Sequence, residues 1–198
     1  MVTVRQIQKL WDARKYEQIL RDLISPRIES AALPELHQAH AAAAAALALI
    51  RLDELHQAHT DLCPRLIQSL IALQETDGGW GDVAITALCV RALSLQNGRG
   101  YAIERGLVYL ADLQQPGGIW PKIPIRRMPA DALVSAFVLL QLADNELFRE
   151  RVDAQAAMTW FESHRWTLDP ATKSLWDHAR LRVPAFTTTP APAESSWA

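Results

Sequence analysis

The sequence lacks the features that mark several common classes of protein. Two cysteines in 198 residues are too few for a disulfide framework and favour a reducing compartment. A formal net charge of −2 argues against a dedicated nucleic-acid-binding protein, which normally carries a basic face. The first residues lack the apolar core of a signal peptide, and the longest stretch of low polarity, residues 41–50, is too short to span a bilayer. We therefore expect a cytoplasmic protein with no transmembrane segment and no nucleic-acid partner.

Hydrophobic side chains recur at helical spacing along most of the chain, and no stretch has the pattern of a strand. Helices are expected over residues 4–23, 27–52 (with a potential break at Pro34), 62–73, 82–96, 102–115, 131–142, 146–164 and 171–181. Asp82 and either Thr60 or Asp61 are expected N-caps, and Asn97-Gly98 an expected helix end. The prediction is one all-α domain over residues 1–182, followed by a disordered Pro/Thr/Ala-rich tail over residues 183–198.

The pattern Q-x-x-x-G-x-W occurs twice, between helical segments, at a spacing typical of helical repeat proteins. The glycines permit a tight turn, and the glutamine amide can bond free carbonyls at a helix end while it rests on the indole. Residues 163–166 fall where a third copy would lie, but the glutamine and glycines are missing. The repeated residues are predicted to be structural: Gln74, Gly78, Trp80, Gln114, Gly118 and Trp120.

These two segments resemble the QW motif of squalene–hopene and oxidosqualene cyclases, and a related repeat in class II diterpene cyclases and protein prenyltransferase β-subunits. Residues 82–88 are similar to the start of that family's inner helices, and the resemblance covers residues 62–142. It implies a partial or small α/α toroid of paired antiparallel helices around an apolar cavity. The chain has fewer helix pairs than the family's full toroids, which leaves an apolar edge and favours a homo-oligomer or a protein partner.

The resemblance also implies a place for acid chemistry. Class II cyclases protonate their substrate with a D-x-D-D stretch at an inner-helix start, and residues 128–131 here keep only the last aspartate, Asp131. Asp131 would be the catalytic acid if burial raised its pKa, and the alternative is an N-cap of the following helix. Trp80, Trp120 and either Trp160 or Trp166 would offer aromatic faces to a carbocation.

A basic segment precedes the helix that begins near Asp131. Lys122, Arg126 and Arg127 beside a helix N-terminus would form a pocket for the diphosphate of a prenyl diphosphate or for another anion. The alternative is a solvated basic loop.

A metal site is a further hypothesis. Asp61-Leu62-Cys63 matches in letters the Asp-x-Cys pair with which prenyltransferase β-subunits hold zinc, and the hexapeptide ELHQAH occurs twice just upstream. His37/His40 and His56/His59 have the spacing of one helix face, so His56, His59, Asp61 and Cys63 form a candidate site for zinc or else magnesium. The alternative is that these histidines simply face solvent.

Three functions stay open from the sequence. The first is a cyclase- or prenyltransferase-like protein with an apolar cavity for an isoprenoid, acting by acid and carbocation chemistry. The second is a non-catalytic helical scaffold or protein-interaction module that kept the fold without the catalytic motif. The third is a metal-dependent enzyme or metal-binding module that uses the histidine pairs.

Overall fold

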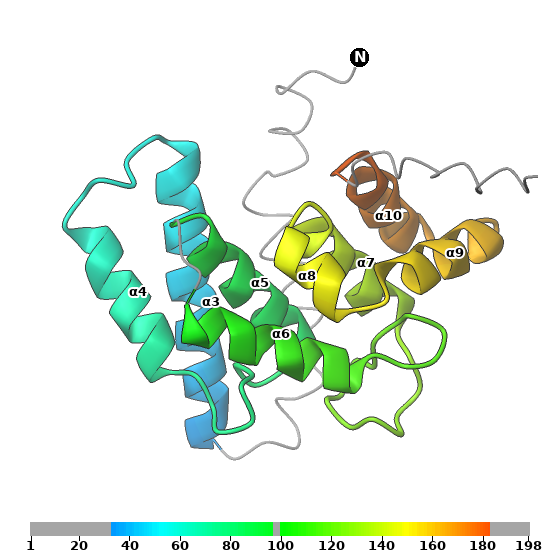
Figure 1. The fold of residues 1–198 in the computed structure, drawn as a ribbon, viewed down its shortest axis with the longest axis horizontal. Helices are drawn as coiled ribbons and strands as arrows, with labels where there is room; N and C mark the ends of the chain where they lie inside the picture. The colour runs from blue at the N-terminus through cyan, green and yellow to red at the C-terminus, as the bar shows by residue number, and fades with distance from the viewer. Residues whose placement is uncertain (1–32, 97–99, 183–198) are drawn as a thin grey trace, which may run out of the picture.

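The computed structural model describes residues 33–96 and 100–182, and every regular element in these residues is an α-helix (Figure 1). The eight helices of this part are α3 (Leu33–Glu54), α4 (Leu62–Ala72), α5 (Val83–Ser94), α6 (Tyr101–Leu113), α7 (Ala132–Leu142), α8 (Glu146–Arg151), α9 (Ala154–His164) and α10 (Pro170–Arg182). The all-α prediction is confirmed for the described residues. The expected helix over residues 4–23, the helix end at Asn97-Gly98 and the tail over residues 183–198 lie outside them.

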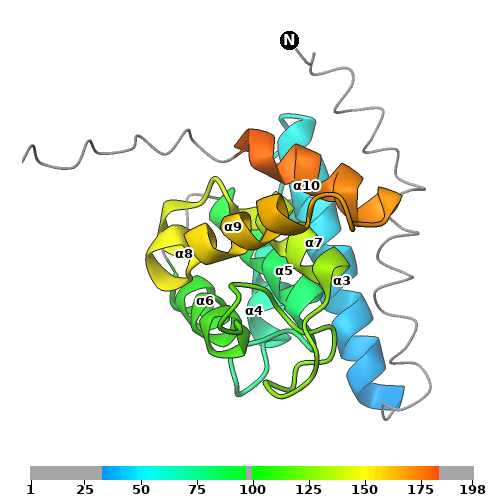
Figure 2. The same ribbon diagram turned by 90° about the vertical axis from the view of Figure 1, so that its right-hand side faces the viewer.

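The helices pack in two rows. One row runs α3, α5, α7, α10, in which each helix contacts the next; α4 packs on α3, α6 on α5 and α8 on α6 (Figure 1 and Figure 2). Stacking of the Phe161 and Trp176 rings, with centroids 4.8 Å apart, joins α9 to α10. We call the first row the inner row and α4, α6, α8 and α9 the outer row.

The inner helices α5 and α7 are buried on nearly every side, as their apolar sequences predict. The alanine run of α3 explains how closely α5 approaches it. Ala42 and Ala46 are buried, and the Cys89 thiol of α5 donates a hydrogen bond to the Ala42 carbonyl oxygen at 3.9 Å. Small side chains at this contact allow the two helix backbones to come together without a void.

One local prediction is wrong. Residues 146–164 form two helices, α8 and α9, because Asp153 caps the second one by accepting a hydrogen bond from the Ala156 N–H at 2.8 Å. The Asp153 N–H in turn donates to Gln114 Oε1 at 2.8 Å, a contact with a distant residue that helical periodicity cannot reveal. Of the two N-caps expected for α4, the structure has Asp61 at that position, although its side chain makes no capping hydrogen bond.

Across residues 33–96 and 100–182, no helix is both long and apolar enough to cross a membrane.

Candidate functional site

The first Gln–Trp segment, residues 74–80, joins three parts of the chain. The Trp80 indole N–H donates to the Leu70 carbonyl near the end of α4 at 2.8 Å. Gln74 Nε2 donates to the Gly78 carbonyl within the turn and to the Ala102 carbonyl of α6, both at 2.8 Å. The indole, and not the glutamine amide, thus bonds the helix-end carbonyl, while the glutamine ties the turn to the next outer helix.

The second Gln–Trp segment, residues 114–120, makes the same set of contacts. The Trp120 indole N–H donates to the Leu110 carbonyl at 2.7 Å, and Gln114 Nε2 donates to the carbonyls of Gly118 at 2.8 Å and Asp153 at 3.1 Å. The two segments therefore act as equivalent clamps between consecutive helix pairs.

Gly78 and Gly118 occupy positions that exclude other residues. Their φ angles are +95° and +79°, a region that favours glycine. A Cβ on Gly78 would lie 2.6 Å from the Arg105 carbonyl oxygen, and one on Gly118 would overlap the backbone nitrogen of Ala157. The turns must approach α6 and α9 this closely for the glutamine bonds to form.

Asp131 is the counterpart of Asp82 in the first copy. Asp82 Oδ1 accepts a hydrogen bond from the Ile85 N–H at 2.8 Å, and Asp131 Oδ1 accepts one from the Val134 N–H at 2.9 Å. One turn later, the hydroxyl oxygens of Thr86 and Ser135 accept the backbone N–H groups of Trp80 and Trp120, respectively. Of the two roles predicted for Asp131, the structure shows that of the helix N-cap.

The two copies differ between the tryptophan and this aspartate. Gly81 alone joins Trp80 to Asp82, whereas residues 121–130, which we call the basic loop, join Trp120 to Asp131. The loop closes on itself through a bridge between Pro121 and Ala130, and the Asp131 N–H donates to the Trp120 carbonyl at 2.8 Å.

The predicted anion-binding side chains lie in the basic loop. Lys122 is half-buried, and Arg126 and Arg127 are exposed. The loop follows the second Gln–Trp segment, so these cations come from a different repeat unit than the apolar hollow described below.

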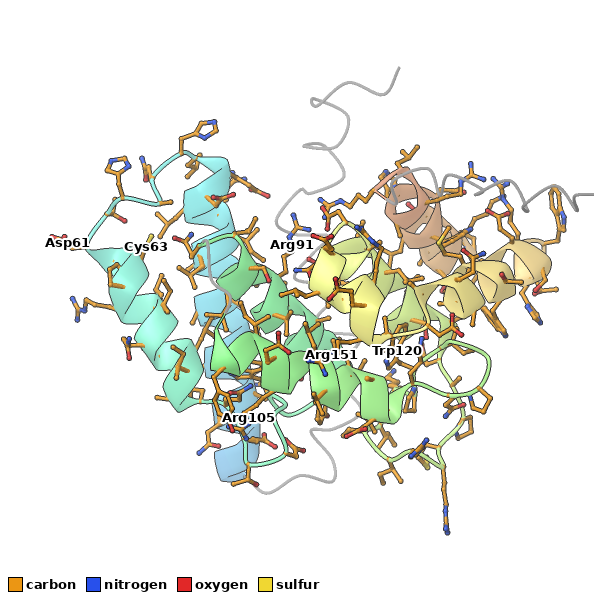
Figure 3. All side chains as sticks on the ribbon, viewed as in Figure 1. Asp61, Cys63, Arg91, Arg105, Trp120 and Arg151 are labelled. Carbon is orange, nitrogen blue, oxygen red and sulfur yellow. The ribbon has the colours of Figure 1, made fainter. Side chains whose placement is uncertain are left out.

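The predicted metal ligands are not brought together. Helix α3 ends at Glu54, so His56 and His59 lie in a turn and do not share a helix face. Cys63 is buried, with its sulfur 3.8 Å from the Gln57 carbonyl, whereas Asp61 at the same end of α4 is exposed (Figure 3). Within residues 33–96 and 100–182, no three His, Cys, Asp or Glu side chains form a group that could hold a metal ion. The sequence spacing failed here because it assumed a continuous helix.

The four tryptophans that were expected to offer aromatic faces to a carbocation do not surround one site. Trp80 and Trp120 are fully buried between helices, and Trp120 stacks on Phe148 with ring centroids 6.1 Å apart. Trp160 stacks on His164, and Trp166 is 88% exposed at the turn after α9. Trp80 and Trp120 thus serve the core packing of the two clamps.

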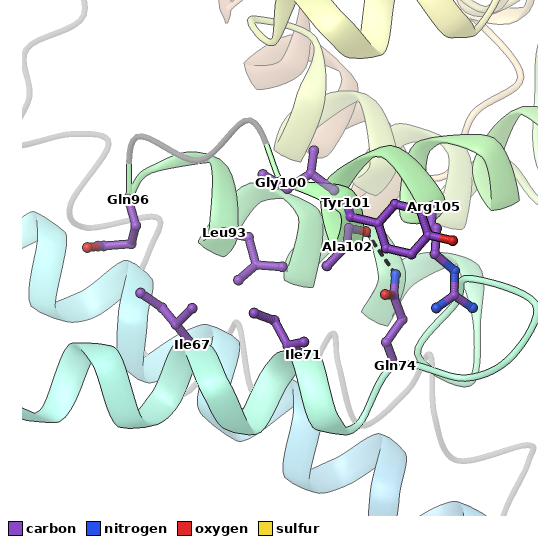
Figure 4. Close-up of a pocket in the computed structure, with 10 residues that line it drawn as sticks. Ile67, Ile71, Gln74, Leu93, Gln96, Gly100, Tyr101, Ala102 and Arg105 are labelled. Atoms are coloured by element: carbon purple, nitrogen blue, oxygen red, sulfur yellow. Dashed lines mark hydrogen bonds between the residues drawn. The ribbon is translucent and has the colours of Figure 1, made fainter.

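A hollow of about 300 Å³ lies between α4 and α6, beside the first Gln–Trp segment (Figure 4). Ile67 and Ile71 of α4 form one wall, and Tyr101 and Ile103 of α6 lie opposite. Arg105 lies at its edge, where its guanidinium donates to the carbonyls of Glu75 and Thr76 at 2.7 and 2.8 Å. No sequence pattern predicted this hollow, because its walls come from separate helices, with Ile67 and Ile71 on α4 and Tyr101 and Ile103 on α6.

The described residues form an all-helical fold. Its outer and inner helices are joined twice by the same hydrogen-bonded turn. No protein-family model, no curated protein and no solved structure matches the chain.

Proposed function

We propose that the chain is a non-catalytic helical scaffold that binds another protein, built as a partial α/α toroid of paired helices. The observation that carries this proposal is the equivalence of Asp131 and Asp82. Each caps an inner helix and is followed, one turn later, by a hydroxyl that accepts the tryptophan N–H. A residue repeated in both copies with the same contacts is accounted for by folding of the repeat, so these contacts do not set Asp131 apart for acid chemistry.

Exposed apolar side chains support the binding role. Trp166 and Tyr101 are 88% and 80% exposed, and Ile125 of the basic loop is 54% exposed. Exposed aromatic residues are enriched where proteins bind one another, because they bury a large area with few rotatable bonds. These side chains offer contact area at several points of the outer surface.

The test compares binding with turnover. The full chain is cross-linked in cell extract, a co-purifying protein is identified and purified, and native mass spectrometry then measures the stoichiometry of the reconstituted complex. We expect a complex of fixed stoichiometry with both the wild type and Asp131→Asn, since asparagine is as good an N-cap as aspartate. Turnover of squalene or a prenyl diphosphate by the wild type that is lost in a folded Asp131→Asn variant would overturn the proposal.

A second candidate function is the binding of an isoprenoid or similar apolar ligand in the hollow between α4 and α6. Its volume of about 300 Å³ falls at the lower end of the range for small-molecule pockets. Ile67, Ile71, Leu93 and Ile103 give it an apolar lining. We expect farnesol to raise the melting temperature of the wild type but not of Ile71→Asp, with Leu62→Asp as a control for an exposed leucine of the same helix. Equal shifts in all three proteins would exclude this site.

A further inference from the structure

The basic loop is an addition to the repeat that the clamp itself does not require. In the first copy a single glycine, Gly81, connects Trp80 to its inner-helix cap, and the clamp forms completely. In the second copy the same clamp forms with residues 121–130 inserted at that point. The clamp therefore does not need the inserted residues, and those between the buried Pro121 and the core-packed Ala130 are open to another function.

The basic loop is held in one shape. Gln115 Nε2 donates to the carbonyls of Arg126 and Met128, and the Met128 N–H donates to the Ile125 carbonyl at 2.9 Å. Pro121, Pro124 and Pro129 restrict the backbone further because each fixes its own φ angle. A loop that is already ordered loses little conformational entropy when it binds.

The side chains that this braced loop presents are cationic and apolar. Arg126 and Arg127 are exposed, and no carboxylate of the described residues pairs with them. By contrast, Arg151 and Arg180 on α8 and α10 both pair with glutamates. Ile125, which directly precedes Arg126, is 54% exposed, and Ile123, two residues earlier, is 41% exposed.

We propose that the basic loop is the docking site for an acidic protein segment that also carries apolar side chains. This inference rests on the proposed scaffold function and names the chemistry of its partner. Each guanidinium can donate two parallel hydrogen bonds to one carboxylate, and Ile123 and Ile125 supply the apolar contact beside it. Because both isoleucines are about half covered, they are suited to a shaped protein surface more than to insertion into a lipid layer.

The experiment selects random displayed peptides on the immobilised full chain and measures their binding by fluorescence anisotropy. Four variants accompany the wild type: Arg126→Glu/Arg127→Glu, Arg126→Lys/Arg127→Lys, a shortened chain in which one glycine replaces residues 121–130, and Arg65→Glu. The shortened chain copies the connection of the first repeat, and Arg65, an exposed arginine of α4, is the matched control. Circular dichroism verifies that each variant is folded.

We expect the wild type and Arg65→Glu to select peptides rich in Asp and Glu with interspersed apolar residues. Affinity for these peptides should fall by at least about tenfold in Arg126→Glu/Arg127→Glu and weaken with added salt, because opposed charges are replaced by like charges. Arg126→Lys/Arg127→Lys should lose less affinity, since it keeps the charge but not the bidentate hydrogen-bond geometry. Arg126→Glu/Arg127→Glu tests the docking site by itself, even if the shortened chain does not fold.

Several outcomes overturn the inference. Selected peptides that bind Arg126→Glu/Arg127→Glu as tightly as the wild type would place docking elsewhere and leave the scaffold function intact. Failure to select any acidic peptide would also overturn it, while the cross-linking experiment decides the scaffold function separately. Loop-dependent binding to phosphatidylserine vesicles without peptide binding would identify a lipid surface instead, and loop-dependent binding of inorganic pyrophosphate alone would identify a small-anion site.

Discussion

The two copies of the repeat have the same clamp and different connections. In both, the indole N–H donates to a carbonyl near the end of one outer helix, and the glutamine donates to a backbone carbonyl at or near the start of a later one, α6 in the first copy and α9 in the second. The connection that follows the tryptophan is one glycine in the first copy and the basic loop in the second. The comparison shows that the hydrogen bonds define the repeat, and that the chain between tryptophan and cap is free to vary.

Substitution of the clamp tryptophans should have the largest effect. Trp80→Ala and Trp120→Ala should each destabilise the fold by about 3–5 kcal/mol, the range for removing a large aromatic side chain from a core. Trp→Phe at either position keeps most of the volume, loses the N–H bond to a buried carbonyl and should cost about 1–3 kcal/mol. Urea unfolding measures these differences. Similar losses of unfolding free energy at both positions would support the equivalence of the two copies, and a negligible loss at one of them would contradict it.

The clamp glycines should be the next most sensitive positions. Gly118→Ala should cost more than about 1 kcal/mol, because alanine at positive φ is strained and its Cβ would overlap the backbone of α9. The neighbouring Gly117 is the matched control, since its Cβ would lie 3.5 Å from the nearest atom, an ordinary contact. Thermal unfolding of both variants would contradict the assignment if Gly117→Ala were the more damaging change.

Loss of the aspartate caps should have a moderate effect. Asp82→Ala and Asp131→Ala should each destabilise the protein by about 0.5–2 kcal/mol, the usual cost of removing an N-cap. Asp82 should lie at the upper end, because its side chain is buried whereas Asp131 is half-buried. Unfolding free energies of the alanine and asparagine variants check this, with asparagine expected to restore most of the loss. A stabilising effect of Asp131→Ala would contradict the capping role, because it would mean that the aspartate is retained at a cost in stability.

The smallest effect concerns the place where a third copy is missing. There Asp169 caps α10, and its hydrogen bond from the Thr172 hydroxyl, with further bonds from the backbone, lowers the pKa of its carboxyl group. Because the folded pKa is below the unfolded one, this stabilisation is present above the unfolded pKa and is lost as the pH falls through the folded pKa.

The protection factors of the first α10 amides, which are their hydrogen-exchange rates corrected for intrinsic exchange at each pH, should therefore fall as the medium is acidified through this range. The change should be small because Asp169 is exposed. Asp169→Asn serves as the control and should remove that pH dependence. An unchanged acid response in the variant would mean that other carboxylates control the end of the helix row.

Much of the fold was predictable because its signals are local. The apolar circumference of residues 83–94 and 132–142 predicted inner helices, and Asp82 and Asp131 stand where N-caps are expected. The division of residues 146–164 was not predicted: Asp153 caps α9 locally, but its bond with Gln114 joins residues far apart in the chain. The proposed metal set failed for the same kind of reason: the end of α3 at Glu54 removes the helix face on which His56 and His59 were paired.

The sequence by itself determined the helical class of the described chain and the positions of the two Gln–Trp segments, because periodicity, glycine and capping residues act over a few neighbours. Only the tertiary structure decided which groups the glutamines and indoles bond, since their partners include residues far along the chain. It also decided that Asp131 shares its contacts with Asp82 and that the two copies differ in the basic loop. Those contacts form when the helices pack, and sequence spacing alone does not predict them.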